Sequence, residues 1–226
     1  MRTSTISQLK RARERQQSVV LATRLRDGSE ELLSPGEESA LADAARDALR
    51  SDRNGAVTVR GEEWFLQVFN PPLRMIIVGG VHIAQHLAPM ARQTGYAVTL
   101  VDPRAAFAST ERFPGTELNH QWPGPAMAEL APDQRTAVVA LSHDPKIDDP
   151  ALQAALQSSA FYVGALGSRR THAGRCERLA QAGVAQERLQ RIHAPIGLNI
   201  AARSPAEIAV SIIAEVTETL RRGDPR

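Results

Sequence analysis

The sequence Met75-Ile76-Ile77-Val78-Gly79-Gly80-Val81-His82-Ile83-Ala84 begins a stretch that closes with Val98-Thr99-Leu100-Val101-Asp102. A short apolar run breaks at a pair of glycines, a segment of helical length follows, and a second apolar run ends in an aspartate. This order predicts a strand, a tight turn, a helix and a second strand, with an acidic residue about twenty residues beyond the turn. Such a turn places free N–H groups and the positive end of a helix dipole where a phosphate binds. The stretch therefore predicts a nucleotide-like ligand.

The turn departs from the glycine pattern of dinucleotide-binding proteins, G-x-G-x-x-G/A. Gly79 can form the tight turn, but Val81 stands where the second glycine lets the backbone approach a pyrophosphate. We expect the valine side chain to obstruct the usual dinucleotide pose. The turn then either holds a phosphate-bearing ligand in another pose or is kept for packing alone. The contacts predicted here are Gly79, Gly80, Val81, His82 and Ile83.

From Leu73 onward, apolar runs alternate with segments of helical length. The runs at 75–78, 98–101, 137–141 and 161–166 are continuous, as in parallel strands buried on both faces. Helices are expected at 83–94, 124–130, 150–157, 168–182 and 204–220. Ser204, Pro205 and Glu207 give the last helix a capping box. The pattern predicts a doubly wound, Rossmann-like α/β domain with a mostly parallel sheet over residues 71–226.

Residues 1–70 have a different rhythm and predict a small N-terminal α+β domain. We expect a short helix at 5–15, a strand at 18–23, a helix at 37–49 and strands at 56–60 and 64–69. Asn70-Pro71-Pro72 interrupts the pattern stiffly, which marks the boundary between the two domains.

The composition of the 226-residue chain, with 42% hydrophobic and 23% charged residues, is that of a globular protein. A net charge of +2 and 4% aromatic residues do not favour nucleic-acid binding, which needs clustered cations and stacking surfaces. No apolar run reaches the ~20 residues that span a bilayer, and residues 1–15 lack the apolar core of a signal peptide. Cys176 is the only cysteine, so no intramolecular disulfide can form. We expect a cytoplasmic protein that binds neither nucleic acid nor membrane.

Unusual polar residues follow the predicted strands, at the edge where ligands of such sheets bind. Asp102 could accept hydrogen bonds from a diol and Arg104 could attract a phosphate, although a salt bridge within the loop would explain both equally well. Ser142-His143-Asp144-Pro145-Lys146 gathers a hydroxyl, an imidazole, a carboxylate and an ammonium group. A flexible point charge such as Lys146 suits an oxyanion, and we therefore favour a binding loop there over a solvated one. The predicted contacts are Asp102, Arg104, His143, Asp144 and Lys146.

The segment Gly164-Ala165-Leu166-Gly167-Ser168-Arg169-Arg170 resembles a second cradle for an anion. Gly164 and Gly167 permit unusual backbone angles, and Ser168 can cap the following helix. Two guanidinium groups at a helix N-terminus oppose the dipole, so an anion is expected to offset them. The alternative is pairing with Glu177 or Asp144. A fifth candidate loop is His193-Ala194-Pro195-Ile196-Gly197-Leu198-Asn199, which we expect between helices.

Neither a metal centre nor a catalytic group is predicted. His82 and His86 stand one helical turn apart, but no third ligand has a recognisable spacing. The Ser-His-Asp order at 142–144 does not imply a catalytic triad, because neighbours in sequence rarely have triad geometry. Cys176 is expected to be an inert, buried thiol, with a sulfur-handling role as the alternative.

Taken together, these motifs resemble the XdhC/CoxI family of accessory proteins for molybdenum hydroxylases such as xanthine dehydrogenase and carbon monoxide dehydrogenase. The resemblance covers residues 73–216 and the family's C-terminal Rossmann domain. Residues 1–70 lack the Gly-Ser-x-Pro-Arg-like segment with which family members often begin. The matching strings lie at residues 77–85, 101–104 with Phe107-Ala108, 111–114, 141–146, 162–172, 192–198 and 203–209.

The resemblance implies a chaperone that binds the molybdenum cofactor, molybdopterin, without turnover of its own. Such a protein protects the cofactor while a terminal sulfur is installed, and it delivers the cofactor to an apo molybdenum hydroxylase. A cysteine desulfurase is a further implied partner. Asp102 or Asp144 would then meet the pterin edge.

Two other classes of function remain open at this point. One is an oxidoreductase that uses NAD(P) or a flavin dinucleotide, with His143 or Lys146 as general acid. The other is a nucleotide sensor without catalysis. The sequence does not specify which hydroxylase is served, which form of the cofactor is bound, or whether the chain forms a homodimer.

Overall fold

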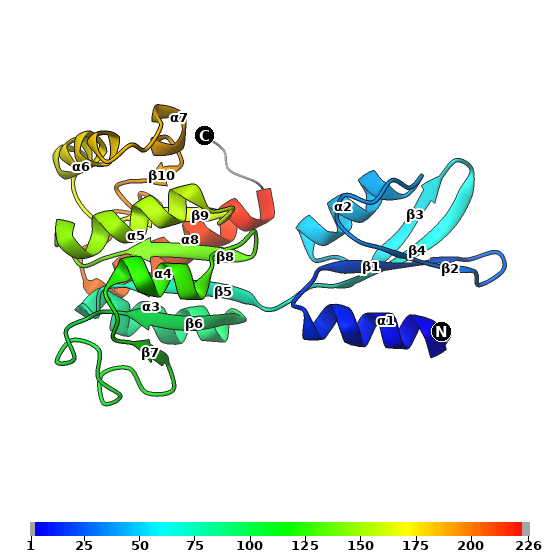
Figure 1. The fold of residues 1–226 in the computed structure, drawn as a ribbon, viewed down its shortest axis with the longest axis horizontal. Coiled ribbons are helices and arrows are strands. Elements are labelled where there is room, and N and C mark those ends of the chain that lie inside the picture. Colours follow the sequence, from blue (N-terminus) through cyan, green and yellow to red (C-terminus); the bar gives the residue numbers. More distant parts are fainter. Residues whose placement is uncertain (1–2, 223–226) are drawn as a thin grey trace. The chain divides into compact units, whose positions relative to one another are not determined.

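The computed structural model describes residues 3–222 and divides at Pro71 and Pro72 into two compact units, residues 1–71 and 72–226 (Figure 1). Met1 and Arg2, from the stretch compared with a signal peptide, lie outside the described residues, as do the last four residues of the expected Rossmann-like domain. Within residues 3–222, no helix combines the length and apolar character needed to cross a bilayer.

The N-terminal unit is a four-stranded antiparallel sheet in the order β2-β1-β4-β3. A buried cluster that includes Val20, Trp64 and Leu66 joins the sheet to α2. The elements are α1 (Thr3–Glu14), β1 (Val19–Arg24), β2 (Glu30–Leu33), α2 (Ala42–Ser51), β3 (Gly55–Val59) and β4 (Glu62–Phe69).

The expected start of α2 was wrong by five residues, and β2 was not predicted. Residues 37–41 are held as a turn instead: Glu37 accepts a hydrogen bond from the Ser34 N–H (2.6 Å), and the Ser39 hydroxyl binds both Glu31 (2.6 Å) and the Leu41 N–H (3.2 Å). The sequence did not predict β2 because it begins with two glutamates, a residue type that is depleted in strands. It forms because it pairs with β1.

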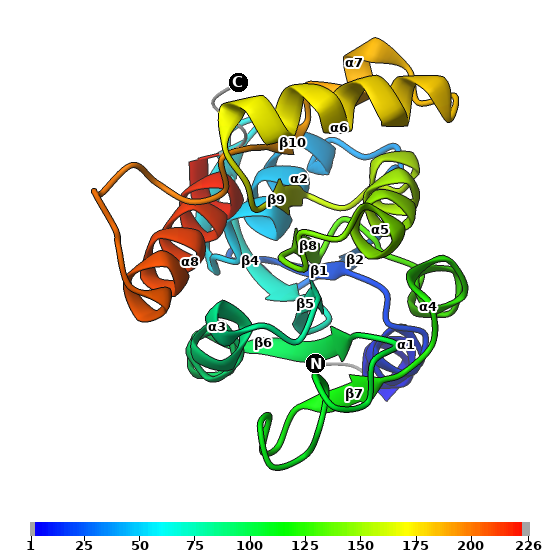
Figure 2. The same cartoon turned by 90° about the vertical axis from the view of Figure 1, so that its left-hand side faces the viewer.

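The second unit is a six-stranded parallel sheet in the order β10-β9-β8-β5-β6-β7, with helices on both faces (Figure 2). The predicted doubly wound, Rossmann-like α/β fold is therefore confirmed. Its strands are β5 (Leu73–Val78), β6 (Tyr96–Val101), β7 (Glu117–Asn119), β8 (Thr136–Ala140), β9 (Tyr162–Ala165) and β10 (Ile192–His193). Its helices are α3 (His82–Gln93), α4 (Pro123–Leu130), α5 (Pro145–Gln157), α6 (Arg169–Gln181), α7 (Gln186–Leu189) and α8 (Pro205–Arg222).

Two separate cores explain why the central strands are continuous apolar runs. Met75 and Ile77 of β5 face a core shared with α3 and α8. Ile76 and Val78 face the opposite core, shared with α4, α5, α6 and α7. Because successive side chains of a strand point to opposite faces, both sets must be apolar when helices cover both faces.

The predicted capping box of α8 is confirmed, whereas the predicted start of α5 was wrong. Glu207 accepts a hydrogen bond from the Ser204 N–H (2.9 Å), and the Ser204 hydroxyl accepts one from the Glu207 N–H (3.3 Å). α5 begins at Pro145, because Asp144 caps it by accepting a hydrogen bond from the Lys146 N–H (2.9 Å). Pro150, expected at the helix start, lies in the second turn, where it removes one backbone hydrogen bond. Lys146 thus belongs to a helix and not to a loop.

Candidate functional site

The strand order places the expected ligand-binding crevice between β5 and β8. Counted within the second unit, the strands run 3-2-1-4-5-6 across the sheet, and the direction of winding reverses between the first and the fourth, β5 and β8. Gly79, with φ of 102°, ends β5 so close to the next loop that a Cβ atom would lie 2.7 Å from the Ser142 nitrogen. The glycine therefore allows the loops after β5 and β8 to touch at this point.

Gly80 has a similar packing role beside β6. A Cβ atom there would lie 2.4 Å from the Phe107 carbonyl oxygen, and the Gly80 N–H donates to Asp102 Oδ2 at 2.8 Å. The two glycines thus hold the turn against both flanking loops. Neither contact involves a ligand, so packing alone is sufficient to require glycine at both positions.

The N-terminus of α3 offers backbone donors to the crevice. No side chain caps this helix and its first turn contains no acidic residue. Among the described residues, the first turn of α3 shows no backbone acceptor for the N–H groups of His82 and Ile83. Free N–H groups and the helix dipole together favour an anion.

Val81 contributes to the core of the domain. Its residue is half-buried, and its side chain packs against the core on the α3 and α8 face. The side chain is therefore partly occupied by packing, and its obstruction of a dinucleotide stays a prediction.

Asp102 is buried and its carboxylate is already occupied. Besides the Gly80 N–H, it accepts hydrogen bonds from Arg104 through the backbone nitrogen (2.9 Å), Nε (2.9 Å) and Nη2 (2.7 Å). Burial alone would raise the pKa of Asp102, but the hydrogen bonds from Arg104 and Gly80 outweigh burial and hold this pKa below its usual value. These four hydrogen bonds use the carboxylate's accepting capacity. The geometry is that of the loop salt bridge considered above.

Arg104 is held on two sides by its neighbours. Its guanidinium group also lies over the Phe107 ring, 4.1 Å from the ring centroid. The hydrogen bond to Asp102 raises the Arg104 pKa. The remaining exposed edge, not the whole group, is available to a phosphate.

His143 in the loop after β8 and Lys146 in the first turn of α5 both face solvent. Both residues are exposed, and neither side chain has an ion-pair partner among residues 3–222. His143 adopts a φ of 63°, a left-handed conformation that non-glycine residues rarely occupy outside special sites. Its backbone N–H donates to Asp148 Oδ2 at 3.1 Å. The hydrogen bond to Asp148 therefore helps to hold His143 in this unusual conformation.

Asp148 and Arg175 form a buried pair that the sequence did not reveal. Each side chain is 2% exposed, and Arg175 Nη2 lies 4.0 Å from Asp148 Oδ2 and donates to the Leu166 carbonyl at 2.8 Å. Asp148 also accepts from the Ser142 hydroxyl at 2.6 Å. Burial raises the pKa of Asp148 and lowers that of Arg175. The pair ties the loop after β8 to the loop after β9.

The first turn of α6, which follows the loop after β9, carries two cations that have no ion-pair partner within residues 3–222. Ser168 caps α6 by accepting from the Thr171 N–H (3.2 Å), and Gly167 has a φ of 137°. Arg169 and Arg170 are exposed, and within residues 3–222 neither has an ion-pair partner, so the pairing with Glu177 or Asp144 considered above is not formed. Within the described residues, no ion pair therefore offsets the unfavourable interaction of these two cations with the positive end of the helix dipole.

The fifth candidate loop follows a strand, β10, and does not lie between helices as expected. It is fixed by Glu215 of α8, which accepts hydrogen bonds from the Tyr162 hydroxyl (2.6 Å) and the Gly197 N–H (2.8 Å), with His193 Nδ1 at 3.3 Å. Burial alone would raise the Glu215 pKa, but hydrogen bonds from His193 and Tyr162 hold it below its usual value. A Cβ atom on Gly164 would lie 2.5 Å from Ile196 Cδ1, so this glycine serves packing of the loop over β9.

The remaining candidates give no metal centre or activated thiol. The part of the chain described, residues 3–222, contains no group of three or more His, Cys, Asp or Glu side chains arranged to hold a metal ion. Cys176 is half-buried and not fully buried as expected; its Sγ lies 3.5 Å from a ring nitrogen of His172, and burial raises the thiol pKa. A raised pKa keeps the thiol protonated, which disfavours nucleophilic chemistry.

Fold and site together define a Rossmann-type domain whose strand ends are followed by helix N-termini and by cations without an ion-pair partner among residues 3–222. The particular family follows from comparison: the model of the XdhC Rossmann domain matches residues 75–216, and the chain belongs to the XdhC family.

Similar proteins occur among the curated proteins and the solved structures. The chain is 36% identical over 148 residues to the molybdenum cofactor insertion chaperone PaoD of Escherichia coli (strain K12). The aligned region covers 66% of this chain and 40% of PaoD. The chain is 30% identical over 159 residues to a probable xanthine dehydrogenase subunit of Bacillus subtilis (strain 168), covering 70% and 46% of the two chains. The chain thus spans less than half the length of either relative.

The crystal structure of a xanthine dehydrogenase from Bacillus halodurans covers 98% of this chain and 65% of its own, with a TM-score of 0.70 at 20% identity. This likeness shows the fold.

Proposed function

We propose that this chain binds the molybdenum cofactor and acts as a chaperone for its insertion into a molybdenum hydroxylase of the xanthine dehydrogenase or carbon monoxide dehydrogenase type. The observation that carries the proposal is the pair Arg169 and Arg170, exposed at the N-terminus of α6 without an ion-pair partner in residues 3–222. An anionic ligand would relieve their conflict with the helix dipole. Family membership and the similarity to PaoD support the same conclusion.

Molybdopterin offers groups that match the crevice chemically. It carries a terminal phosphate, an anionic dithiolene and a pterin with donors and acceptors. Arg169 and Arg170 would hold the phosphate. The free N–H groups of α3 and the Lys146 ammonium group would donate further hydrogen bonds to anionic groups of the ligand. Asp144 keeps one carboxylate oxygen free for the pterin edge, whereas Asp102 would hold Gly80 and Arg104 in place.

The proposal extends to partners and location. An apo-hydroxylase would receive the cofactor, and a cysteine desulfurase would supply the terminal sulfur while the cofactor is held. The chain would have no turnover of its own and would act in the cytoplasm.

Cofactor analysis of the full chain tests this function. The protein is purified from cells with intact cofactor biosynthesis, denatured and oxidised, and the fluorescent pterin is quantified. We expect a near-stoichiometric amount, reduced about tenfold or more in the Arg169→Ala/Arg170→Ala variant, because charge-assisted hydrogen bonds contribute about 1.5–3 kcal/mol. Arg46→Ala/Arg50→Ala, which removes the same charge from exposed positions of α2, is the control. Absence of pterin from the wild-type chain, alongside a loaded known binder, would refute the proposal.

A second candidate is a nicotinamide- or flavin-dependent oxidoreductase or a nucleotide sensor. The strand order and the uncapped N-terminus of α3 favour it, since both occur in dinucleotide-binding folds. Trp122, 57% exposed at the start of α4, provides a fluorescence signal for titration with NAD(H) and NADP(H). Micromolar binding by the cofactor-free chain would favour this class, and redox turnover would separate an enzyme from a sensor.

A further inference from the structure

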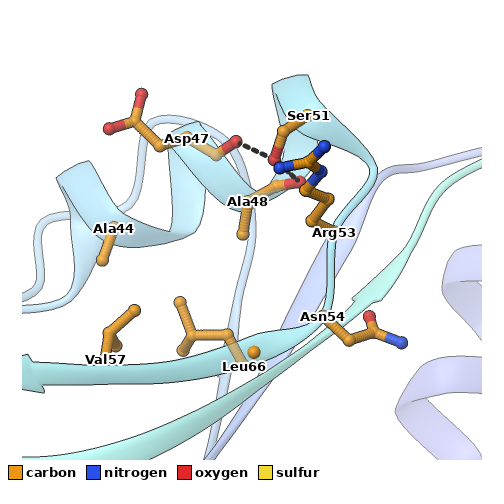
Figure 3. Close-up of a pocket in the computed structure, with 9 residues that line it drawn as sticks. Ala44, Asp47, Ala48, Ser51, Arg53, Asn54, Val57 and Leu66 are labelled. Atoms are coloured by element: carbon orange, nitrogen blue, oxygen red, sulfur yellow. Dashed lines mark hydrogen bonds between the residues drawn. The ribbon is translucent and has the colours of Figure 1, made fainter.

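A pocket of about 360 Å³ lies wholly within the N-terminal unit, between α2 and β3 (Figure 3). Ala44 and Ala48 of α2 form one wall, and Val57 of β3 and Leu66 of β4 form the floor. Arg53 stands at the end where α2 leads into β3. The wall and the floor are thus apolar, and one end carries a cation. Ser51, Asn54 and Asp47, which pairs with Arg50 at 3.1 Å, also line the pocket.

β3 is an edge strand, and its hairpin determines which backbone groups are free. Val59 and Glu62 flank a two-residue turn in which Arg60 and Gly61 have φ of 51° and 80°, a type I′ geometry. The closing pair of such a turn exchanges both hydrogen bonds, and bonded pairs then alternate along the ladder. Val59, Val57 and Gly55 therefore bond to β4, whereas the N–H and C=O groups of Ala56 and Thr58 point away from the sheet.

A hydrogen bond beyond the hairpin supports this assignment of bonded and outward-pointing backbone groups. Val68 lies two residues past Leu66, the partner of Gly55, and should also point its N–H toward the β3 side. Its N–H donates to Asn54 Oδ1 at 2.7 Å, in line with the ladder.

The inner face of β3 is covered only in part. α2 packs mainly against β4 and β1. Val57 and Val59 pack against the buried cluster beneath α2 but stay half-buried, and the pocket lies beside them. The edge therefore combines unpaired backbone groups with apolar surface, which natural sheets usually protect.

We propose that β3 is a docking edge for an extended segment of a partner protein, added as a fifth strand. Its backbone pairs with Ala56 and Thr58, and its inward side chains cover Val57 and Val59 and enter the pocket beside α2. This mode gives affinity through main-chain hydrogen bonds and specificity through alternate side chains. The inference goes beyond the proposed cofactor function and does not depend on it.

Charge identifies the kind of segment. Arg53 and Arg60 flank the edge, both are exposed, and within residues 3–222 neither has an ion-pair partner. A second copy paired antiparallel about Val57 would set Arg53 of one chain beside Arg60 of the other at both ends, which is repulsive. A segment of alternating apolar residues with an acidic residue at each end meets both cations favourably.

Fluorescence anisotropy with a labelled peptide tests the docking edge in the full chain. The probe is Asp-Thr-Val-Thr-Val-Thr-Asp, with N-terminal label and amidated C-terminus, and its counterpart has Lys in place of both Asp. We expect saturable binding of the acidic peptide that weakens with added salt, and at least about tenfold weaker binding of the basic one. Equal binding of the two, or none by the acidic peptide, overturns the proposal.

Two substitutions at one position separate backbone pairing from side-chain effects. Thr58→Pro removes an N–H that β4 does not use, a change edge strands tolerate. Thr58→Val keeps the N–H and alters only the face away from the pocket. We expect Thr58→Pro to weaken peptide binding about tenfold or more and Thr58→Val to bind as the wild type does.

Amide exchange in the wild-type chain gives the same answer without a variant. On peptide addition, NMR should show slower exchange at Ala56 and Thr58, with little change at Val57 and Val59. Unchanged exchange at Ala56 and Thr58 with bound peptide overturns the proposal. Self-association that Thr58→Pro abolishes, measured by sedimentation, overturns it in favour of a second copy as the occupant.

Discussion

Replacing Asp102 by asparagine tests the reading that this carboxylate organises the crevice and does not itself contact ligand. The carboxylate accepts four hydrogen bonds, two on each oxygen. An amide keeps one oxygen, so two of the four donors would face an NH₂ group. Hydrogen bonds to charged groups contribute about 1.5–3 kcal/mol each. Because Arg104 is 35% exposed and can turn to water, we take the lower end and expect a loss of about 3 kcal/mol.

The pH dependence supplies a sharper criterion. The folded pKa of Asp102 lies below its unfolded value of 3.8, so between the two the unfolded chain binds more protons. Stability from Asp102 is therefore fully present above pH 3.8 and is lost as the pH falls through the folded pKa. The difference in unfolding free energy between wild type and Asp102→Asn should shrink on acidification.

Asp148→Asn is the matched control, because it makes the same change at a carboxylate whose pKa burial raises. Here the folded chain binds more protons between pH 3.8 and the higher folded pKa, so the wild type gains relative to the variant as the pH falls through that interval. Urea unfolding followed by circular dichroism from pH 3 to 7 measures both, and Asp102→Asn should lower the urea midpoint by roughly 1–1.5 M near neutrality. A shift below about 0.3 M, or the same sign of pH dependence for both variants, would refute the reasoning.

Two further outcomes follow from close packing and buried polar groups. Gly79→Ala should lower the free energy of unfolding by about 2 kcal/mol or more, because its Cβ would meet the Ser142 backbone at 2.7 Å. Gly28→Ala, also at positive φ but in open space, should lower it by about 1 kcal/mol. Thermal unfolding compares the two variants, and equal losses would contradict the packing role of Gly79. Tyr162→Phe should cost about 1–3 kcal/mol and speed proteolysis of the loop after β10, because buried Glu215 loses a 2.6 Å hydrogen bond; an unchanged cleavage rate would show that Glu215 does not fix that loop.

Local patterns in the sequence were enough to predict the main parallel strands and the start of α8. The strands were recognisable because both faces are buried, which forces continuous apolar runs. Ser204 and Glu207 satisfy each other across one helical turn, so their spacing alone specified the cap. β7 and β10, with three and two residues, are too short for a pattern.

The buried pair of Asp148 and Arg175 could not be predicted, because it depends on two helices meeting under the crevice. Nothing local distinguishes Asp148 from the neighbouring Asp149, which is less buried and pairs with Arg178 instead. Asp102 is an intermediate case: its place at a strand end and a salt bridge with Arg104 could be considered from the sequence, but the hydrogen bond from the Gly80 N–H depends on the turn it faces.

The contacts of the glycine turn with its neighbouring loops weaken it as evidence for a dinucleotide. Gly79 and Gly80 are each required by a neighbouring loop, so an imperfect dinucleotide pattern at this turn is compatible with packing alone. In the proposed function, selection of an anionic ligand then rests on groups that packing leaves unsatisfied: the N–H groups at the start of α3, Lys146, and above all Arg169 and Arg170. Because those arginines lie after β9 and not after β5, a ligand that binds both them and the N-terminus of α3 must extend along the sheet edge past β8. A ligand with separated anionic groups meets that requirement better than an isolated phosphate does.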